Sequence, residues 1–200
     1  MIARLRGELL EAGDGRIVVD AGGVGYEVLV PQSVLVEMPP VGEWVDIRVR
    51  QVFREDGVSL YGFLDPFDRR LFDLLTEVKG CGPKTGLAVL GDVGAEVAAT
   101  AISSQDAKTL TRATGVGPRL AERIILELKD KIQQENFARK VARASGQAVV
   151  RTTAPPDELV DALMALGYRR PEAEQAAEIA REQADTVEEQ IPIALRGLRK

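Results

Sequence analysis

The stretch GCGPK at residues 80–84 returns 35 residues later as GVGPR at residues 115–119. Each copy has a leucine five residues before its first glycine, Leu75 and Leu110, and each is followed by an apolar run typical of a helix. Two glycines around one apolar residue favour a tight turn. The proline fits the first helical position, because its missing N–H would have no partner there. The repeat therefore predicts one unit made twice: helix, Gly-x-Gly turn, helix.

This repeated turn has the features of a phosphate-binding site. The first N–H groups of a helix lack intrahelical partners, and the helix dipole places about half a positive charge beside them. An anion can bind there although the chain carries a net charge of −5. A tight turn without a ligand is the alternative for one copy, but two copies, each followed by proline and a cation, favour a pair of backbone-binding sites. The candidate DNA-binding residues are Gly80, Gly82, Lys84, Gly115, Gly117, Arg119 and Arg123.

The composition excludes several classes of site. The chain has no histidine and one cysteine, Cys81, which rules out histidine-based triads, HExxH zinc sites, Cys-x-x-Cys centres and an internal disulfide. We expect no metal and no cofactor. No apolar run of 18 residues occurs, and charge interrupts the N-terminus at once, so we expect a soluble, cytoplasmic protein without a signal peptide or membrane segment.

Residues 1–64 have the pattern of a small β-barrel. Apolar residues alternate with other residues over 24–30 and again over 45–49, which is typical of half-buried strands, and glycines separate the runs. About five short strands suit an OB-fold, although an SH3-like barrel would show the same periodicity.

A hairpin is predicted between the runs at 52–53 and 59–63, because Asp56-Gly57 is a strong turn signal. Glu55 and Asp56 would then lie at its tip, with Arg54 just behind. Two carboxylates at a tip would repel phosphates and push strands apart, whereas ordinary turn chemistry would explain the aspartate alone.

Helical periodicity begins at residue 65. Asp65-Pro66 suits a helix start, and Ser103–Asp106 is similar to a capping box. Residues 65–135 are therefore predicted as a helical domain. Residues 136–156 contain four basic and no acidic side chains together with Ser, Gly and Pro, which indicates a flexible linker that either contacts phosphate or acts only as a tether.

Residues 157–200 are predicted to form three helices. Leu166-Gly167-Tyr168 ends the first, Pro171 starts the second, and Asp185 caps the third together with Glu188.

These residues resemble the RuvA family of Holliday-junction-recognition proteins. The resemblance covers nearly the whole chain and includes the start MIxRLRG, the run GGVGYEV at 22–28, RED at 54–56 with LYGF at 60–63, both Gly-x-Gly hairpins, AER at 121–123 and LGY at 166–168. It implies an α+β multidomain chain: an N-terminal OB-fold, a central domain with two helix-hairpin-helix motifs, a flexible linker and a C-terminal three-helix, UBA-like domain.

The resemblance also implies a function. Family members are non-catalytic subunits that bind four-way junction DNA in recombination and repair. They assemble as homotetramers, sometimes two per junction, and work with the hexameric ATPase RuvB and the resolvase RuvC. Glu55 and Asp56 match the acidic pin of the family, and Arg54 beside it is a further candidate DNA-binding residue. The partner-binding apolar face falls on Leu163, Leu166, Tyr168 and Leu195, which a domain this small could equally use as core.

Two departures from the family pattern stand out. Cys81 replaces a branched aliphatic residue, and a small thiol should fit there. Pro192 falls inside the expected last helix, where it is costly, so we expect the helix to restart with Pro192 at its first position, which puts the role of Leu195 in doubt.

Two other functions stay open on the residues alone. A helix-hairpin-helix DNA enzyme could use Lys129, Asp130 or Lys131, which follow the second hairpin, although no ligase motif or two-metal carboxylate cluster is present. A single-strand binder would need exposed aromatics on the barrel for base stacking. The candidates are Trp44, Tyr26, Phe53, Tyr61 and Phe63, most of which alternate inward. No Gly-x-x-x-x-Gly-Lys-Ser/Thr loop occurs, so we expect no ATP hydrolysis.

Overall fold

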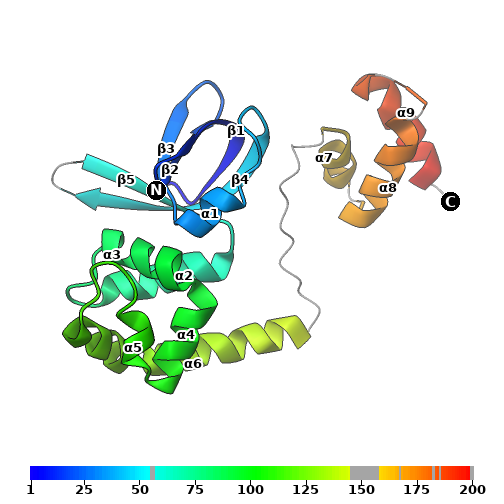
Figure 1. Cartoon of the computed structure of the whole chain (residues 1–200). Coiled ribbons are helices and arrows are strands. Elements are labelled where there is room, and N and C mark those ends of the chain that lie inside the picture. The colour runs from blue at the N-terminus through cyan, green and yellow to red at the C-terminus, as the bar shows by residue number, and fades with distance from the viewer. Residues whose placement is uncertain (55–56, 145–157, 167, 182, 185, 199–200) are drawn as a thin grey trace. The chain divides into compact units, whose positions relative to one another are not determined.

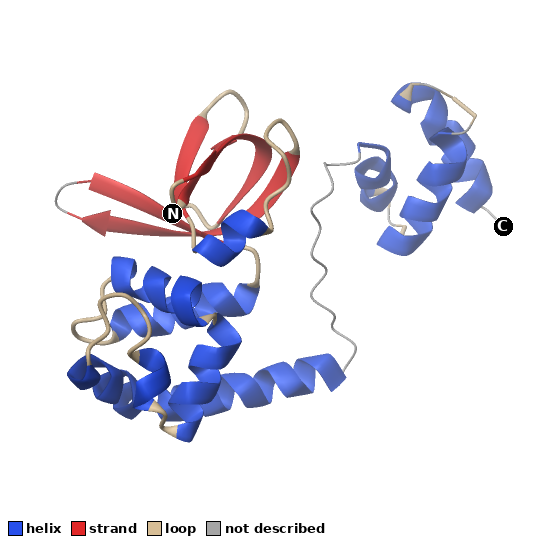
Figure 2. Ribbon diagram, in the orientation of Figure 1, coloured by secondary structure: helices blue, strands red, loops and turns tan. Residues whose placement is uncertain are grey.

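A computed structural model describes residues 1–54, 57–144, 158–166, 168–181, 183–184 and 186–198. The chain divides into two compact units, Met1–Thr153 and Ala154–Lys200. Strands are confined to the first 63 residues, and the rest of the described chain is helical (Figure 2).

Five strands close into a barrel in the order β1-β2-β3-β5-β4 (Figure 1). The neighbours pair antiparallel except β3 and β5, which run parallel at Leu29↔Tyr61. A short helix, α1 (Gln32–Val36), follows the third strand. The parallel pair and this order make the barrel an OB-type Greek key rather than a simple meander. The strands are β1 (Arg4–Gly13), β2 (Arg16–Asp20), β3 (Gly25–Leu29), β4 (Trp44–Arg54) and β5 (Gly57–Phe63).

The apolar residues that alternate in the sequence form the core of the barrel. Val45, Ile47 and Val49 are buried along β4, and Val28 and Val30 are buried around the end of β3. Outward residues of β1 and β4 are charged, and Asp46 accepts hydrogen bonds from the guanidinium groups of Arg4 and Arg6. The predicted half-buried strands are therefore confirmed here.

The helical domain packs on one outer face of the barrel. Tyr61 and Phe63 of β5 point away from the barrel interior and contact the Phe72 ring, with centroids 5.1 and 5.0 Å apart. Arg50 of β4 forms a bidentate ion pair with Asp73 of helix α2 (Pro66–Glu77), which raises the pKa of the guanidinium. One continuous cluster of buried residues thus joins β5 to the helices.

The helical domain begins as predicted. The Asp65 side chain accepts a hydrogen bond from the Phe67 N–H, 2.7 Å away, and Pro66 occupies the first helical position. Its elements are α2 (Pro66–Glu77), α3 (Pro83–Ala88), a π-helical turn at Val89–Val93, α4 (Ala95–Ser104), α5 (Ala107–Leu110) and α6 (Pro118–Ala144).

The capping box predicted at Ser103–Asp106 is wrong in its first half. Ser103 and Ser104 are the last residues of α4, which ends at the left-handed residue Gln105. The cap of the next helix is Asp106, whose side chain accepts from the Thr109 N–H at 3.1 Å and from the Thr109 hydroxyl, and this lowers the pKa of the carboxyl group.

The helix α6 is longer than the sequence predicted. It continues to Ala144, so the expectation that the chain leaves helix at residue 136 is wrong. Residues 136–144 contain no Gly, Pro or Ser; those residues of the predicted linker all lie at 145 or beyond. Arg139 holds this part of the helix, because its guanidinium lies 3.7 Å from the centre of the Phe67 ring and pairs with Glu96.

The C-terminal unit contains three described helices: α7 (Glu158–Ala165), α8 (Arg170–Arg181) and α9 (Val187–Leu198). Its core consists mainly of alanines with Leu159, Val160 and Leu163. Pro171 is the second residue of α8, close to its predicted place. Gly167 and Asp185, predicted as helix stop and helix cap, lie outside the described residues.

Pro192 does not restart the last helix. It is the sixth residue of α9, which begins at Val187, and that prediction is wrong. The carbonyl of Thr186 accepts from the Glu189 and Gln190 N–H groups at 3.1 and 3.0 Å, and this closes the first turn before the proline. Pro192 is exposed.

Within the described ranges, no single helix has the length and apolar composition of a membrane span; one pair, Pro83–Val93 and Ala95–Ser104, reaches that threshold jointly but is bent by 98°.

Candidate nucleic-acid interface

The sequence repeat is a structural repeat. Three backbone hydrogen bonds that shape each turn recur at the same offset of 35 residues, with lengths that differ by 0.1 Å or less. The first copy has Val78 N to Leu75 O, Cys81 N to Val78 O and Gly86 N to Gly82 O; the second has Ala113 N to Leu110 O, Val116 N to Ala113 O and Ala121 N to Gly117 O. Both stretches therefore fold into the same helix-turn-helix unit, as predicted.

The two glycines of each turn have different tasks. Gly80 and Gly115 adopt left-handed backbone angles, with φ of 93° and 84°, which side chains rarely tolerate. Gly82 and Gly117 do not need such angles, and a Cβ added to either would meet no protein atom within 4 Å. The second glycines are exposed and bordered by open space, so a ligand can approach the backbone closely there.

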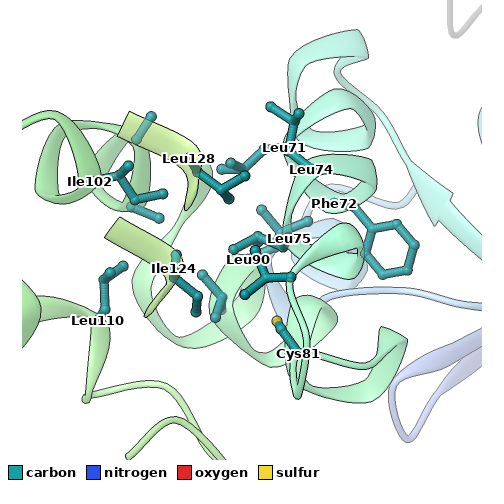
Figure 3. Packing of buried hydrophobic residues seen from close by; sticks show 14 of the residues in the cluster. Leu71, Phe72, Leu74, Leu75, Cys81, Leu90, Ile102, Leu110, Ile124 and Leu128 are labelled. Atoms are coloured by element: carbon teal, nitrogen blue, oxygen red, sulfur yellow. The ribbon is translucent and has the colours of Figure 1, made fainter. Parts of the chain in front are cut away.

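The residue between the glycines anchors each turn. Cys81 and Val116 are 1% and 5% exposed and belong to the helical core, where Figure 3 shows Cys81 beside Leu75 and Leu90. Burial raises the pKa of the Cys81 thiol from 9.0 to about 11, so it is a neutral apolar group at ordinary pH. The core thus fixes each turn from below while its glycines face outward.

The two turns lie against each other. A Cβ on Gly80 would lie 3.8 Å from Leu120 Cδ1, and one on Gly115 would lie 3.5 Å from Thr85 Oγ1. Leu120 and Thr85 hold the same position in the two copies, five residues after the first glycine. Each copy therefore packs its helix start on the turn of the other, and the arrangement has approximate twofold symmetry.

Two further hydrogen bonds tie the turns together. Arg123 Nη1 of α6 donates to the Lys79 carbonyl of the first turn at 2.9 Å. The Thr114 N–H of the second turn donates to Asp92 Oδ2, 2.8 Å away, in the π-helical turn after α3. Arg123 therefore positions the first turn, and its remaining guanidinium donors stay available for other contacts.

The predicted cations face solvent. Lys84 and Arg119 are the second residues of α3 and α6, and both are exposed. Thr85 and Asp92 were not predicted from the sequence, although Thr85 could have been found by aligning the two copies at their 35-residue offset. The site can hold two backbone phosphates side by side through helix N-termini, each with one cation nearby.

Comparison with known proteins assigns a family to this arrangement. Residues 1–62 match the model of the RuvA N terminal domain, residues 72–130 the SAM-like helix-hairpin-helix tandem, and residues 155–199 the RuvA C-terminal domain. The chain belongs to the RuvA family.

Similar RuvA proteins align along the full chain. A relative from Burkholderia ambifaria is 41% identical over 201 residues, covering all of both proteins. One from Marinomonas sp. is 38% identical over 200 residues, and one from Acidobacterium capsulatum is 36% identical over 200 residues; both alignments cover at least 98% of each chain. All three are named Holliday junction branch migration complex subunit RuvA.

An acidic pin was predicted from the sequence at the β4–β5 hairpin. β4 ends at Arg54 and β5 begins at Gly57, and these two residues pair. The hairpin predicted from Asp56-Gly57 is therefore confirmed in its strands, whereas Glu55, Asp56 and the Arg54 side chain lie outside the described structure. Their roles stay predictions.

The four residues predicted to contact a partner have different environments in the RuvA C-terminal domain. Leu166 is 60% exposed, and Tyr168 is half-buried. Leu163 is completely buried, and Leu195 is partly buried against the same core. Leu166 and Tyr168 are thus accessible to a partner, while Leu163 is needed inside the domain.

Neither alternative to a RuvA function gains support from these residues. Lys131, weighed as a catalytic lysine, has its Nζ 2.7 Å from Glu77 on the surface. Tyr61 and Phe63, weighed as stacking residues, are buried in the helical core. Phe53 differs from them and is 67% exposed.

Proposed function

We propose that this chain binds Holliday junction DNA as a non-catalytic subunit of a branch migration complex. The carrying observation is the pair of exposed Gly-x-Gly turns, which pack on each other and leave open space above Gly82 and Gly117. Such a pair binds backbone phosphates of a duplex arm without reading its sequence. The family and the names of its relatives support this function.

The proposed assembly is a homotetramer formed through the barrel, with one or two tetramers on a junction. Four arms that meet at one centre suit four symmetric copies, each of which binds one arm. The partners we propose are the ATPase RuvB, docked on the C-terminal domain at a face that includes Leu166 and Tyr168, and the resolvase RuvC. The chain itself hydrolyses no ATP in this scheme, and the complex acts in the cytoplasm.

The β4–β5 hairpin would supply the selectivity for a junction. Glu55 and Asp56, one pair per subunit, would oppose phosphates at the crossover and favour separated strands. Repulsion between a carboxylate and a phosphate at close contact is about 1 kcal/mol in water and larger where water is excluded. Replacing Glu55 by Gln and Asp56 by Asn together should leave overall DNA affinity intact and reduce the junction-to-duplex ratio; an increased ratio would contradict the repulsion.

A gel-shift comparison tests the proposed function. A four-way junction and a linear duplex of the same length and composition are titrated across a salt series. We expect tighter binding of the junction and a steep loss of affinity with salt, because many phosphates are neutralised at once. Equal affinity for both substrates would overturn the proposal. Cleavage of junction, nicked or abasic DNA in the presence of Mg²⁺ would indicate an enzyme instead.

A further inference from the structure

The carboxylate of Asp92 contacts the second Gly-x-Gly turn. Its Oδ2 accepts a hydrogen bond from the Thr114 N–H at 2.8 Å, and Thr114 directly precedes Gly115. Both Asp92 and Thr114 are exposed. A negative charge therefore lies at the solvent-facing surface of the turn, beside the place that the proposed function gives to phosphate.

The corresponding contact of the first turn has the opposite charge. Lys79 holds the position of Thr114 at the 35-residue offset, and its carbonyl accepts from Arg123 Nη1 at 2.9 Å. The backbone hydrogen bonds within the two turns agree closely, whereas these two side-chain contacts differ. A cation beside the first turn attracts phosphate, and an anion beside the second turn repels it.

The π-helical turn at Val89–Val93 fixes the position of Asp92. The Gly94 N–H donates to the Val89 carbonyl at 3.2 Å, which closes the turn around Asp92. Gly91 lies against helix α1, since a Cβ added to it would be 3.5 Å from the Gln32 nitrogen. Turns of this kind are frequent at functional sites. The carboxylate is thus in place before DNA binds.

The charge of Asp92 is close enough to act on a phosphate at the start of α6. Gly117 is three residues after Thr114, so their backbone nitrogens are at most about 11 Å apart, even in an extended chain. Screening by salt reduces interactions between exposed charges over about 8–10 Å at physiological ionic strength. The repulsion should therefore be felt at low salt and lost at high salt.

We propose that Asp92 is a positioning residue that sets how tightly the second turn binds phosphate: its hydrogen bond orders the turn, and its charge weakens phosphate binding there. This inference rests on the proposed function. Branch migration moves the DNA arms past the protein, so each backbone contact has to be released and formed again. A second turn that is ordered in advance but opposed by a carboxylate releases phosphate more readily than the first.

Two substitutions separate the hydrogen bond from the charge in the full-length protein. Asp92→Asn removes the charge and keeps an oxygen acceptor, so the junction should bind about two- to threefold tighter than to wild type at about 50 mM salt. That difference should disappear at about 300 mM salt. Asp92→Ala also removes the acceptor and should bind about three- to fivefold more weakly than Asp92→Asn at both salt concentrations, as gel shifts measure.

Hydrogen–deuterium exchange of the DNA-free protein gives an independent measure of the hydrogen bond. Peptides that contain Thr114 should exchange slowly in wild type and Asp92→Asn and faster in Asp92→Ala. The control is Asp130→Asn, which removes an exposed carboxylate about 18 Å along α6 from its first residue. It should change neither the exchange nor the junction affinity.

Three results would overturn the role of Asp92: Asp92→Asn that binds no tighter than wild type at low salt, Asp92→Ala that binds like Asp92→Asn, or equal exchange at Thr114 in all three proteins. Wild-type protein without junction preference would overturn the proposed function instead. The exchange measurement needs no DNA, so the two failures are distinguishable.

Discussion

The two Gly-x-Gly copies share a turn but little of what surrounds it. The first lies between the 12-residue helix α2 and the six-residue α3, whereas the second lies between the four-residue α5 and the 27-residue α6. The backbone hydrogen bonds of the two turns nevertheless agree closely. The working unit is therefore the turn and the first helical residues after it, and helix lengths follow from packing elsewhere in the domain.

The largest expected effect comes from blocking the open glycine of either copy. Gly117→Asp and Gly82→Asp each put a carboxylate where phosphate should approach, and we expect about a hundredfold weaker junction binding, or about 3 kcal/mol. Gly13→Asp adds the same charge at an open position on the barrel and should leave binding unchanged. If Gly82→Asp binds like wild type while Gly117→Asp does not, the copies are unequal.

High pH should lower the free energy of unfolding through the first copy only, because its buried residue Cys81 can lose a proton and Val116 of the second copy cannot. Burial raises the pKa of Cys81 to about 11, so the unfolded chain loses its thiol proton near pH 9 while the folded chain keeps it. Stability contributed by the neutral thiol is therefore present below pH 9 and lost between pH 9 and 11. Urea unfolding at pH 8 and 10.5 should show a loss of about 2 kcal/mol that is absent in Cys81→Val. An equal loss in both proteins would refute the assignment.

The two glycines within a copy should separate stability from binding. Gly115→Ala forces a side chain into left-handed backbone and should reduce the free energy of unfolding by about 1–2 kcal/mol. Gly117→Ala has open space and should change stability by less than about 0.5 kcal/mol while it weakens junction binding severalfold. Denaturant unfolding and gel shifts measure both. Gly80→Ala and Gly82→Ala should repeat the pattern, and a reversed order in either copy contradicts it.

The smallest effect is expected from the cations. Lys84→Gln and Arg119→Gln each remove one exposed charge beside a helix start. Each should weaken junction binding by about 1 kcal/mol and lower the slope of log affinity against log salt by about one. An exposed cation far along α6, Lys131, serves as the comparison through Lys131→Gln. Unchanged slopes in both turn variants would remove Lys84 and Arg119 from the interface.

Patterns with short range in the chain were predicted well from the sequence. The Asp65 cap, the barrel alternation and both turns depend on residues within a few positions, and each is found in the structure. The extension of α6 was missed because Arg139 is held by Phe67 and Glu96, which are distant in sequence. The restart predicted at Pro192 was wrong for another reason, since the first turn of α9 closes at Thr186, before Pro192 can interfere.

The candidate site was predicted in its residues but not in its internal support. Glycines and cations follow from the repeat, whereas the contacts of Arg123 with Lys79 and of Asp92 with Thr114 join residues 44 and 22 positions apart. Most barrel aromatics were predicted to face inward. The exposure of Phe53 was not predicted, because strand parity says which side a residue faces and does not say where the barrel core ends.

The helix α6 is one continuous element that joins the second Gly-x-Gly turn to the end of the helical domain. It starts at the second Gly-x-Gly turn and runs 27 residues, about 40 Å, before the chain continues toward the C-terminal unit. The second Gly-x-Gly turn and Ala144 therefore lie at opposite ends of one helix. The Arg139 guanidinium lies on the Phe67 ring and pairs with Glu96, so a displacement of this end of α6 must either break these contacts or move the helical domain with it.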